Sequence, residues 1–95
     1  MNELQLIEGC RKGERRAQKE LYDAYSRKMM GVCLRYVNDR ETARDLLQDG
    51  FMKIFTSMDS YTGSGSFEGW MRKIFVNCAL EYLRKSDVLR EATDL

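Results

Sequence analysis

Four side chains between residues 45 and 52 share the spacing of one helix face. Asp45, Gln48, Asp49 and Met52 follow one another at i, i+3, i+4 and i+7, which places them on one side of an α-helix. A face that carries two carboxylates, an amide and a thioether is available to a partner. The plain alternative is a solvated helix face, the default for an amphipathic helix.

A second group combines an aromatic ring, a flexible loop and an amide. Tyr61 precedes a Gly/Ser-rich loop, which consists of Thr62, Gly63, Ser64, Gly65 and Ser66, and Ile74 and Asn77 follow it. Single-stranded bases stack on aromatic rings and are distinguished by hydrogen bonds to their edges. These residues therefore suit a pocket for an extruded base. Alternatively, Tyr61 covers the edge of the core and Asn77 bonds at the helix surface or into the loop.

Basic residues lie close to this second group. Lys73 and Arg84, with Arg72 and Lys85 nearby, could hold phosphates, and such contacts position a nucleic acid without reading its sequence. Charged runs are also ordinary solvated surface. The net charge of only +1 is low for a nucleic-acid-binding domain, which is usually more basic.

The sequence offers few side chains for catalysis or for metal binding. The chain has no histidine, and its three cysteines, Cys10, Cys33 and Cys78, are far apart and form no CxxC pair. A zinc site or a histidine-based dyad would need groups that are absent. We expect reduced cysteines buried as small hydrophobes, no cofactor and no enzymatic activity.

The composition predicts one small helical domain. Ninety-five residues, 43% of them hydrophobic and 33% charged, fit a single compact domain with a modest core. The chain lacks a secretory signal and any apolar run of about 18 residues, so we expect a cytoplasmic protein without membrane insertion. Proline is absent, and glycines punctuate the helices.

Apolar periodicity predicts an all-α bundle of about four helices, with the Gly/Ser loop before the last. The expected ranges are 3 to 11, 14 to 37, about 40 to 58 and 67 to 85. Gly13 is placed to end the first helix, Asn38 and Asp39 offer N-cap chemistry for the third, and Ser66 for the fourth. Gly50 falls inside the third helix, at a cost of about 1 kcal/mol relative to alanine; the sequence leaves open whether a neighbour packs against it.

The same periodicity predicts which residues of each helix face the core. In chain order they are Leu4, Ile7, Cys10, Ala17, Leu21, Ala24 or Tyr25, Met29, Val32, Tyr36, Ala43, Leu46, Leu47, Phe51, Ile54, Phe55, Met58, Phe67, Trp70, Met71, Ile74, Cys78 and Tyr82.

Residues 14 to 85 resemble region two of bacterial sigma factors of the extracytoplasmic-function (ECF) group, in the sigma-70 family. The positions that carry the resemblance are Ala43, Asp45, Leu46, Gln48, Asp49, Phe51, Phe67, Trp70, Ile74, Asn77, Tyr82, Leu83 and Arg84. Two separate stretches match in the correct order and at the correct distance. Many relatives have a basic residue directly before the asparagine, where this chain has Val76, so the phosphate-contacting stripe is thinner.

The resemblance implies roles for both groups of side chains. Asp45, Gln48, Asp49 and Met52 would bind the clamp helices of the beta-prime subunit of core RNA polymerase. The loop 62 to 66, Tyr61, Ile74 and Asn77 would capture a flipped base of the non-template strand in the promoter minus-ten element, with Lys73 and Arg84 on the backbone. An anti-sigma factor is a further expected partner. Residues 1 to 85 would form the region-two domain, and 86 to 95 the start of a linker to a further domain.

Two other classes stay open. A helical protein-interaction module, such as an anti-sigma docking domain, would use the same acidic and apolar faces without affinity for single-stranded DNA. A helix-turn-helix reader of double-stranded DNA is disfavoured, because the Gly/Ser loop is longer than the three- to four-residue turn of that motif.

Overall fold

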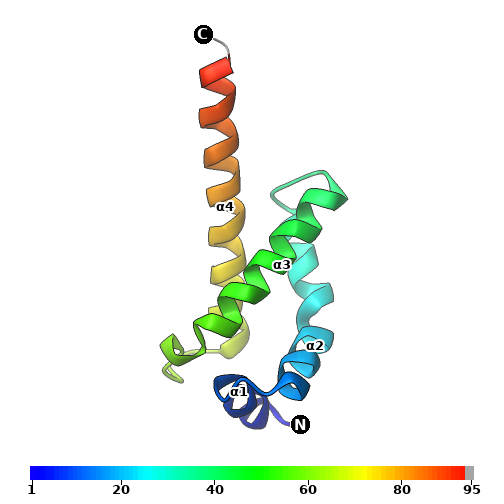
Figure 1. The fold of residues 1–95 in the computed structure, drawn as a ribbon, viewed down its shortest axis with the longest axis vertical. Helices are drawn as coiled ribbons and strands as arrows, with labels where there is room; N and C mark the ends of the chain where they lie inside the picture. The colour runs from blue at the N-terminus through cyan, green and yellow to red at the C-terminus, as the bar shows by residue number, and fades with distance from the viewer. Residues whose placement is uncertain (94–95) are drawn as a thin grey trace.

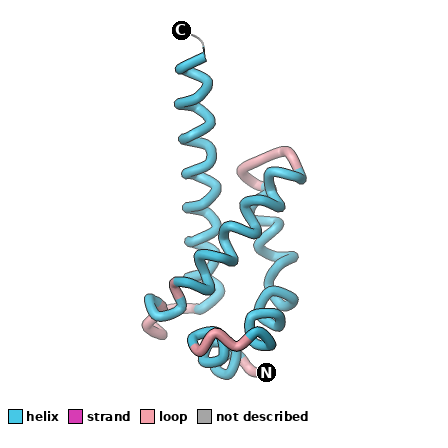
Figure 2. Tube along the Cα trace, in the orientation of Figure 1, coloured by secondary structure: helices cyan, strands magenta, loops and turns pink. Residues whose placement is uncertain are grey.

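The computed structural model describes the backbone of residues 1–93 and the side chains of residues 1–87. Within that range the chain forms helices and connecting loops without a strand, as the periodicity predicts (Figures 1 and 2). The elements are α1 (Glu3–Arg11), α2 (Arg15–Leu34), α3 (Arg40–Thr56), the 3-10 turn η1 (Met58–Ser60) and α4 (Phe67–Thr93).

Helices α3 and α4 begin at caps that the sequence predicts. The Asp39 carboxylate accepts hydrogen bonds from the amides of Glu41 and Thr42 at the start of α3. The Ser66 hydroxyl accepts from the Gly69 amide, 2.8 Å away, at the start of α4. Such caps satisfy amides that have no partner inside the helix. Gly13, with φ of 73°, follows α1 in the left-handed conformation that glycine tolerates.

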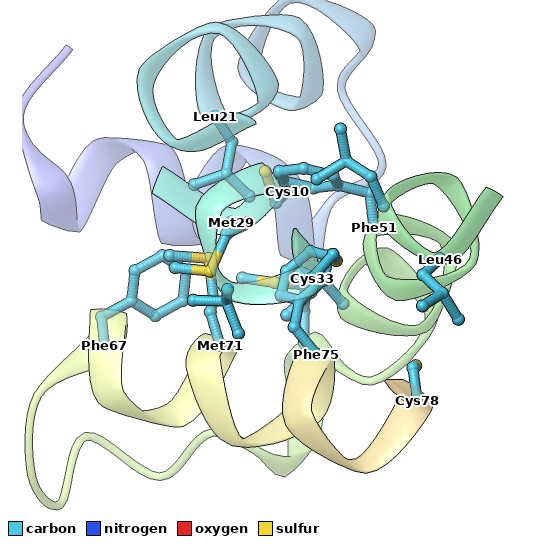
Figure 3. Packing of buried hydrophobic residues seen from close by; sticks show 14 of the residues in the cluster. Cys10, Leu21, Met29, Cys33, Leu46, Phe51, Phe67, Met71, Phe75 and Cys78 are labelled. Atoms are coloured by element: carbon cyan, nitrogen blue, oxygen red, sulfur yellow. The ribbon is translucent and has the colours of Figure 1, made fainter. Parts of the chain in front are cut away.

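The core lies where α2, α3 and α4 meet (Figure 3). Leu21 and Met29 of α2 face Phe67 and Met71 of α4, and the side chains of all four are fully buried. The three cysteines are also buried and are free thiols. Most of the predicted core positions are therefore confirmed.

Helix α1 rests on the start of α2 through a close backbone approach. A Cβ atom on Gly9 would stand only 2.5 Å from the Cβ of Ala17, so the two helices touch where neither has a long side chain. The buried face of α1 consists of Leu6, Ile7 and Cys10. The prediction of Leu4 on this face was wrong, since Leu4 is 70% exposed.

Close packing explains why a glycine, Gly50, stands inside α3. Its position in α3 faces the ring of Phe75 in α4, and an added Cβ would overlap that ring. The ring of Phe75 also stands edge-on to that of Phe51, with centroids 5.1 Å apart. The glycine thus admits an aromatic side chain between α3 and α4.

Helix α4 differs from its prediction in its core face and its length. Phe75 and Ala79 are fully buried, whereas Tyr82, predicted near the core, is 41% exposed. The helix also runs to Thr93, beyond the expected end at Lys85, so residues 86–93 are helical; Asp94 and Leu95 lie outside the described residues. Figure 1 shows the C-terminal part of α4 projecting past the other helices.

The helix ends differ in two smaller ways. Helix α2 ends at Leu34 instead of the expected Val37, although Val37 remains buried. Met58 belongs to η1 and not to α3, and its side chain still packs into the core. Among residues 1–93, none of the helices has both the length and the apolar character of a membrane span.

Candidate nucleic-acid and protein interfaces

The four predicted side chains of α3 form an exposed ridge. Asp45, Gln48, Asp49 and Met52 are all exposed, and Met52 has 62% of its surface open to solvent. The helix holds this orientation because its other face, which includes Leu46, is buried. An exposed methionine among carboxylates and an amide gives the ridge an apolar contact point within a polar face.

A groove borders the ridge on each side. The larger, of about 890 Å³, lies between α2 and α3 and includes Gln48 and Met52 with Arg27, Arg40 and Arg44. The smaller, of about 420 Å³, lies between α3 and α4 and includes Met52, Asp49 and Cys78.

The two sides of the ridge differ in charge. Among the described residues, three arginines and no carboxylate line the groove on the side of α2, whereas the groove on the side of α4 is lined by two carboxylates, Asp49 and Glu81, and two lysines, Lys53 and Lys85. On the α4 side, the Lys53 ammonium lies 3.3 Å from the Glu81 carboxylate, and this hydrogen bond raises the pKa of Lys53. The arginines therefore repel a basic partner on the α2 side of the ridge, and the balanced charges of the α4 side do not.

The Gly/Ser loop has a defined path at the start of α4. Gly63 and Gly65 have φ of 87° and 79°, a conformation that other residues adopt only with strain. The hydroxyl of Tyr61 donates to the carbonyl oxygen of Gly65 at 2.9 Å, which closes the loop over four residues. Residues 62–66 are all exposed, so their backbone and hydroxyl groups are available to a ligand.

Tyr61 lies beneath this loop as part of the core. The side chain is buried, with 7% exposure, and its ring centroid stands 5.2 Å from Phe67 and 5.4 Å from Trp70. The rings of Phe67 and Trp70 also stack on each other. In this arrangement Tyr61 covers the core edge and shapes the loop, and it offers no open face to a base.

Three of the predicted nucleic-acid contacts share one exposed face of α4. Lys73, Asn77 and Arg84 are exposed and spaced at i, i+4 and i+11, close to whole helical turns. Ile74 is half-buried against the core. With a rise of about 1.5 Å per residue, Asn77 lies about 15 Å along the axis from the start of α4. The loop is thus one end of a strip that follows α4 past Asn77 to Arg84.

Among the described residues, the cationic side chains next to this strip, Lys28 and Arg72, form ion pairs, whereas those on the strip do not. The Glu68 carboxylate accepts from Lys28 at 3.0 Å and from Arg72 at 3.2 Å, and the bond from Lys28 lowers the pKa of Glu68. Within the described part of the chain, neither Lys73 nor Arg84 forms an ion pair. Their charges remain available for phosphates.

One residue that the sequence did not single out contacts the loop segment. The guanidinium of Arg11 donates to the carbonyl oxygen of Tyr61 at 2.6 Å, across 50 residues of sequence. Arg11 belongs to a basic group with Lys12, Arg15 and Arg16, and no local pattern separates it from them. Among the described residues, no group of three or more potential ligands is arranged to hold a metal ion.

The geometry and the comparisons identify the family. Residues 21–88 match the family model Sigma-70 region 2, and the chain belongs to this family. It is 32% identical over 79 residues to the RNA polymerase sigma-H factor of Pseudomonas aeruginosa, and 35% identical over 78 residues to the ECF RNA polymerase sigma-E factor of Haemophilus influenzae. The domain is therefore region two of the ECF type, as the resemblance implied.

The comparisons also fix how much of such a protein this chain spans. The alignments cover 83% and 82% of the chain and 41% of each relative, so the chain spans less than half their length. A solved structure matches with a TM-score of 0.79 and 30% identity, over 92% of this chain and 95% of the other. That structure is an engineered region 2 of sigmaE in complex with GTAAAA.

Proposed function

We propose that this chain is the part of a sigma factor that binds core RNA polymerase and recognises and melts the promoter minus-ten element. The main support is the likeness in fold, over 92% of the chain, to a sigmaE region 2 bound to GTAAAA. On this proposal the domain works without enzymatic activity of its own, in the cytoplasm, and an anti-sigma factor is a further partner.

The DNA contact runs along α4 from the loop to Arg84. The exposed groups of residues 62–66 take the extruded base of the non-template strand, Asn77 bonds to a base edge, and Lys73 and Arg84 hold phosphates. Ile74 contributes apolar contact beside Asn77. Tyr61 acts from beneath the loop, because its ring is already covered by Phe67 and Trp70. Extruding a base costs a few kcal/mol, which these contacts offset.

The DNA contact is tested by fluorescence anisotropy with single-stranded probes, namely GTAAAA and a pool with six randomised positions. We expect binding by the wild-type chain and at least about tenfold weaker binding by Asn77→Ala, since an unmet base-edge hydrogen bond costs about 1–3 kcal/mol. Arg35→Ala is the control, because Arg35 is exposed at the far end of α2. No binding of any pool sequence by the folded chain would favour a protein-interaction module without DNA affinity.

The polymerase contact is the ridge of α3. Asp45, Gln48 and Asp49 meet basic and polar groups of the beta-prime clamp helices, and Met52 supplies the apolar centre. The arginines of the α2-side groove disfavour a basic clamp there, so the clamp lies towards the α4 side of the ridge.

A recombinant clamp coiled coil tests the ridge by calorimetry. We expect Asp45→Arg to weaken binding about tenfold or more, and Gln48→Ala to weaken it less. Arg44→Glu is the matched control, since it changes one exposed charge on the neighbouring arginine side and should preserve or strengthen binding. Equal losses in Asp45→Arg and Arg44→Glu would contradict the assigned face.

A further inference from the structure

Arg11 links the first helix to the segment that precedes the loop. Its Nη2 donates to the Tyr61 carbonyl oxygen at 2.6 Å, and its Nη1 donates to the Glu8 carboxylate at 2.9 Å. The side chain is 32% exposed, and the bond to Tyr61 is partly buried. A charged guanidinium that donates to two fixed acceptors forms stronger hydrogen bonds than a neutral donor does.

Tyr61 passes this restraint on to the loop. Its carbonyl oxygen is held by Arg11, its ring is packed against Phe67 and Trp70, and its hydroxyl holds the carbonyl of Gly65. The backbone entering the loop and the backbone near its end are therefore tied to one buried residue. Between these ties lies Gly63, where an added Cβ would meet nothing within 4 Å.

The position of Arg11 is itself set by the core. Helix α1 is buried through Leu6, Ile7 and Cys10 and lies against Ala17 of α2 at Gly9. Helix α1 also contacts η1, and Figure 1 places α1 and the η1 segment at the same end of the molecule. The guanidinium thus projects from the end of a helix that is packed against the core.

We infer that Arg11 is a positioning residue for DNA recognition, which acts through Tyr61 to hold the loop 62–66 in its binding conformation. This inference rests on the proposed function. Holding a loop in the bound conformation improves affinity because less conformational freedom is lost on binding. Base selectivity depends on the same restraint, since a loosely held loop fits several bases about equally well. Arg11 touches no DNA in this proposal.

Arg11→Ala, Tyr61→Phe and their combination test this with the single-stranded probes. We expect Arg11→Ala to weaken binding about fivefold, because more conformational freedom of the loop is lost on binding, and to reduce discrimination between the preferred hexamer and a scrambled one. Tyr61→Phe, which removes the bond to Gly65, should act similarly. The combined variant should lose less than the product of the two, because both act on one loop.

Lys12→Ala is the matched control. It removes an equal charge from the adjacent exposed position, and the Lys12 ammonium forms no ion pair among the described residues. It should leave both affinity and discrimination unchanged. Far-ultraviolet circular dichroism and clamp binding should be the same for all variants, which separates loop positioning from loss of fold.

The salt dependence of binding separates positioning from a direct contact. If Arg11 bound a phosphate, its loss would lower the slope of log affinity against log salt by about 0.7. An unchanged slope in Arg11→Ala, with shifted amide resonances of Gly63 and Gly65, is expected. A lower slope, or unchanged resonances and affinity, overturns the inference. If the wild-type chain bound no probe, the proposed function would fail, while the Gly63 and Gly65 resonances would still decide whether Arg11 orders the loop.

Discussion

The thiol of Cys33 is a titratable group without exposed surface. Burial raises its pKa to about 11, so at pH 8 only about one molecule in a thousand carries the reactive thiolate. Burial also raises the pKa of Cys78, but that thiol lines the groove between α3 and α4 and lies near the Lys53 ammonium, which favours the thiolate. The two cysteines therefore differ in reactivity.

We predict that an aromatic disulfide reagent at pH 8 labels Cys78 before Cys33, whereas all three thiols react at once in guanidinium chloride. Cys33→Ala should remove the slowest native phase and leave the others. Because folding raises the pKa of Cys33, the stability that its neutral form contributes is present below pH 9 and is lost as the pH rises through about 11. Three equally rapid native reactions would contradict the burial.

Asp39 combines a structural and an electrostatic role at the start of α3. The Thr42 hydroxyl donates to its carboxylate at 2.6 Å, and this bond, together with that from the Thr42 amide, lowers the pKa of Asp39. Because the folded pKa lies below the unfolded value, the charged carboxylate contributes stability above that value, and this stability is lost as the pH falls through the folded pKa.

We predict that Asp39→Asn reduces the acid sensitivity of the fold. Asparagine caps helices about as well as aspartate but does not ionise in this range, so at neutral pH the thermal midpoint should change little. Between about pH 5 and pH 2.5, the midpoint of the wild-type chain should fall further than that of the variant. Glu68, whose pKa is also lowered, should leave the variant some acid sensitivity. Parallel pH profiles for both chains would contradict this role.

At the scale of the elements, two helical glycines have opposite surroundings. Gly50 of α3 faces the ring of Phe75, and Gly31 of α2 has no neighbour within 4 Å of an added Cβ. Alanine is favoured over glycine inside a helix by about 0.5–1 kcal/mol. At Gly50 that gain is opposed by overlap with a fully buried ring.

We predict that Gly31→Ala raises the free energy of unfolding by about 0.5–1 kcal/mol, and that Gly50→Ala lowers it by about 1–3 kcal/mol, the usual cost of overpacking. Urea denaturation measures both. Adding Phe75→Leu to Gly50→Ala should recover part of the loss, because a smaller side chain leaves room for the methyl group. Stabilisation by Gly50→Ala alone would refute the close packing.

The elements also indicate why sequence reasoning succeeded in some places and failed in others. Spacing along one helix is a local property, so the caps Asp39 and Ser66 and the exposed ridge of α3 were predictable. The exposure of Tyr82 was not, since it depends on how α4 packs against the other helices. The burial of Phe75 depends on a glycine in another helix.

The candidate DNA site shows the same division. The exposed loop and the face shared by Lys73, Asn77 and Arg84 follow from composition and periodicity. The position of Tyr61 beneath the loop depends on packing against Phe67 and Trp70, and either position was compatible with the sequence. The bond between Arg11 and Tyr61 joins residues 50 apart, and no local pattern predicts it.

At the scale of the whole molecule, the two proposed interfaces are carried by different helices. The ridge belongs to α3, and the DNA strip to the loop and α4. The net charge is only +1, so the general field of the molecule attracts DNA weakly, and affinity depends on a few local cations. The salt dependence of DNA affinity should therefore reveal which single residues contact phosphates.

We predict that the affinity for a single-stranded hexamer falls with salt, and that Lys73→Ala and Arg84→Ala each reduce the slope of log affinity against log salt by about 0.7, the value for one phosphate contact. Both variants should weaken binding to all sequences alike. Asn77→Ala should instead reduce discrimination between hexamers without changing the slope, since it removes a base contact and no charge. Gln48→Ala, on the ridge, should change neither quantity. A lower slope in Gln48→Ala, or a slope in Lys73→Ala and Arg84→Ala equal to that of the wild-type chain, would show that DNA does not follow the exposed face of α4.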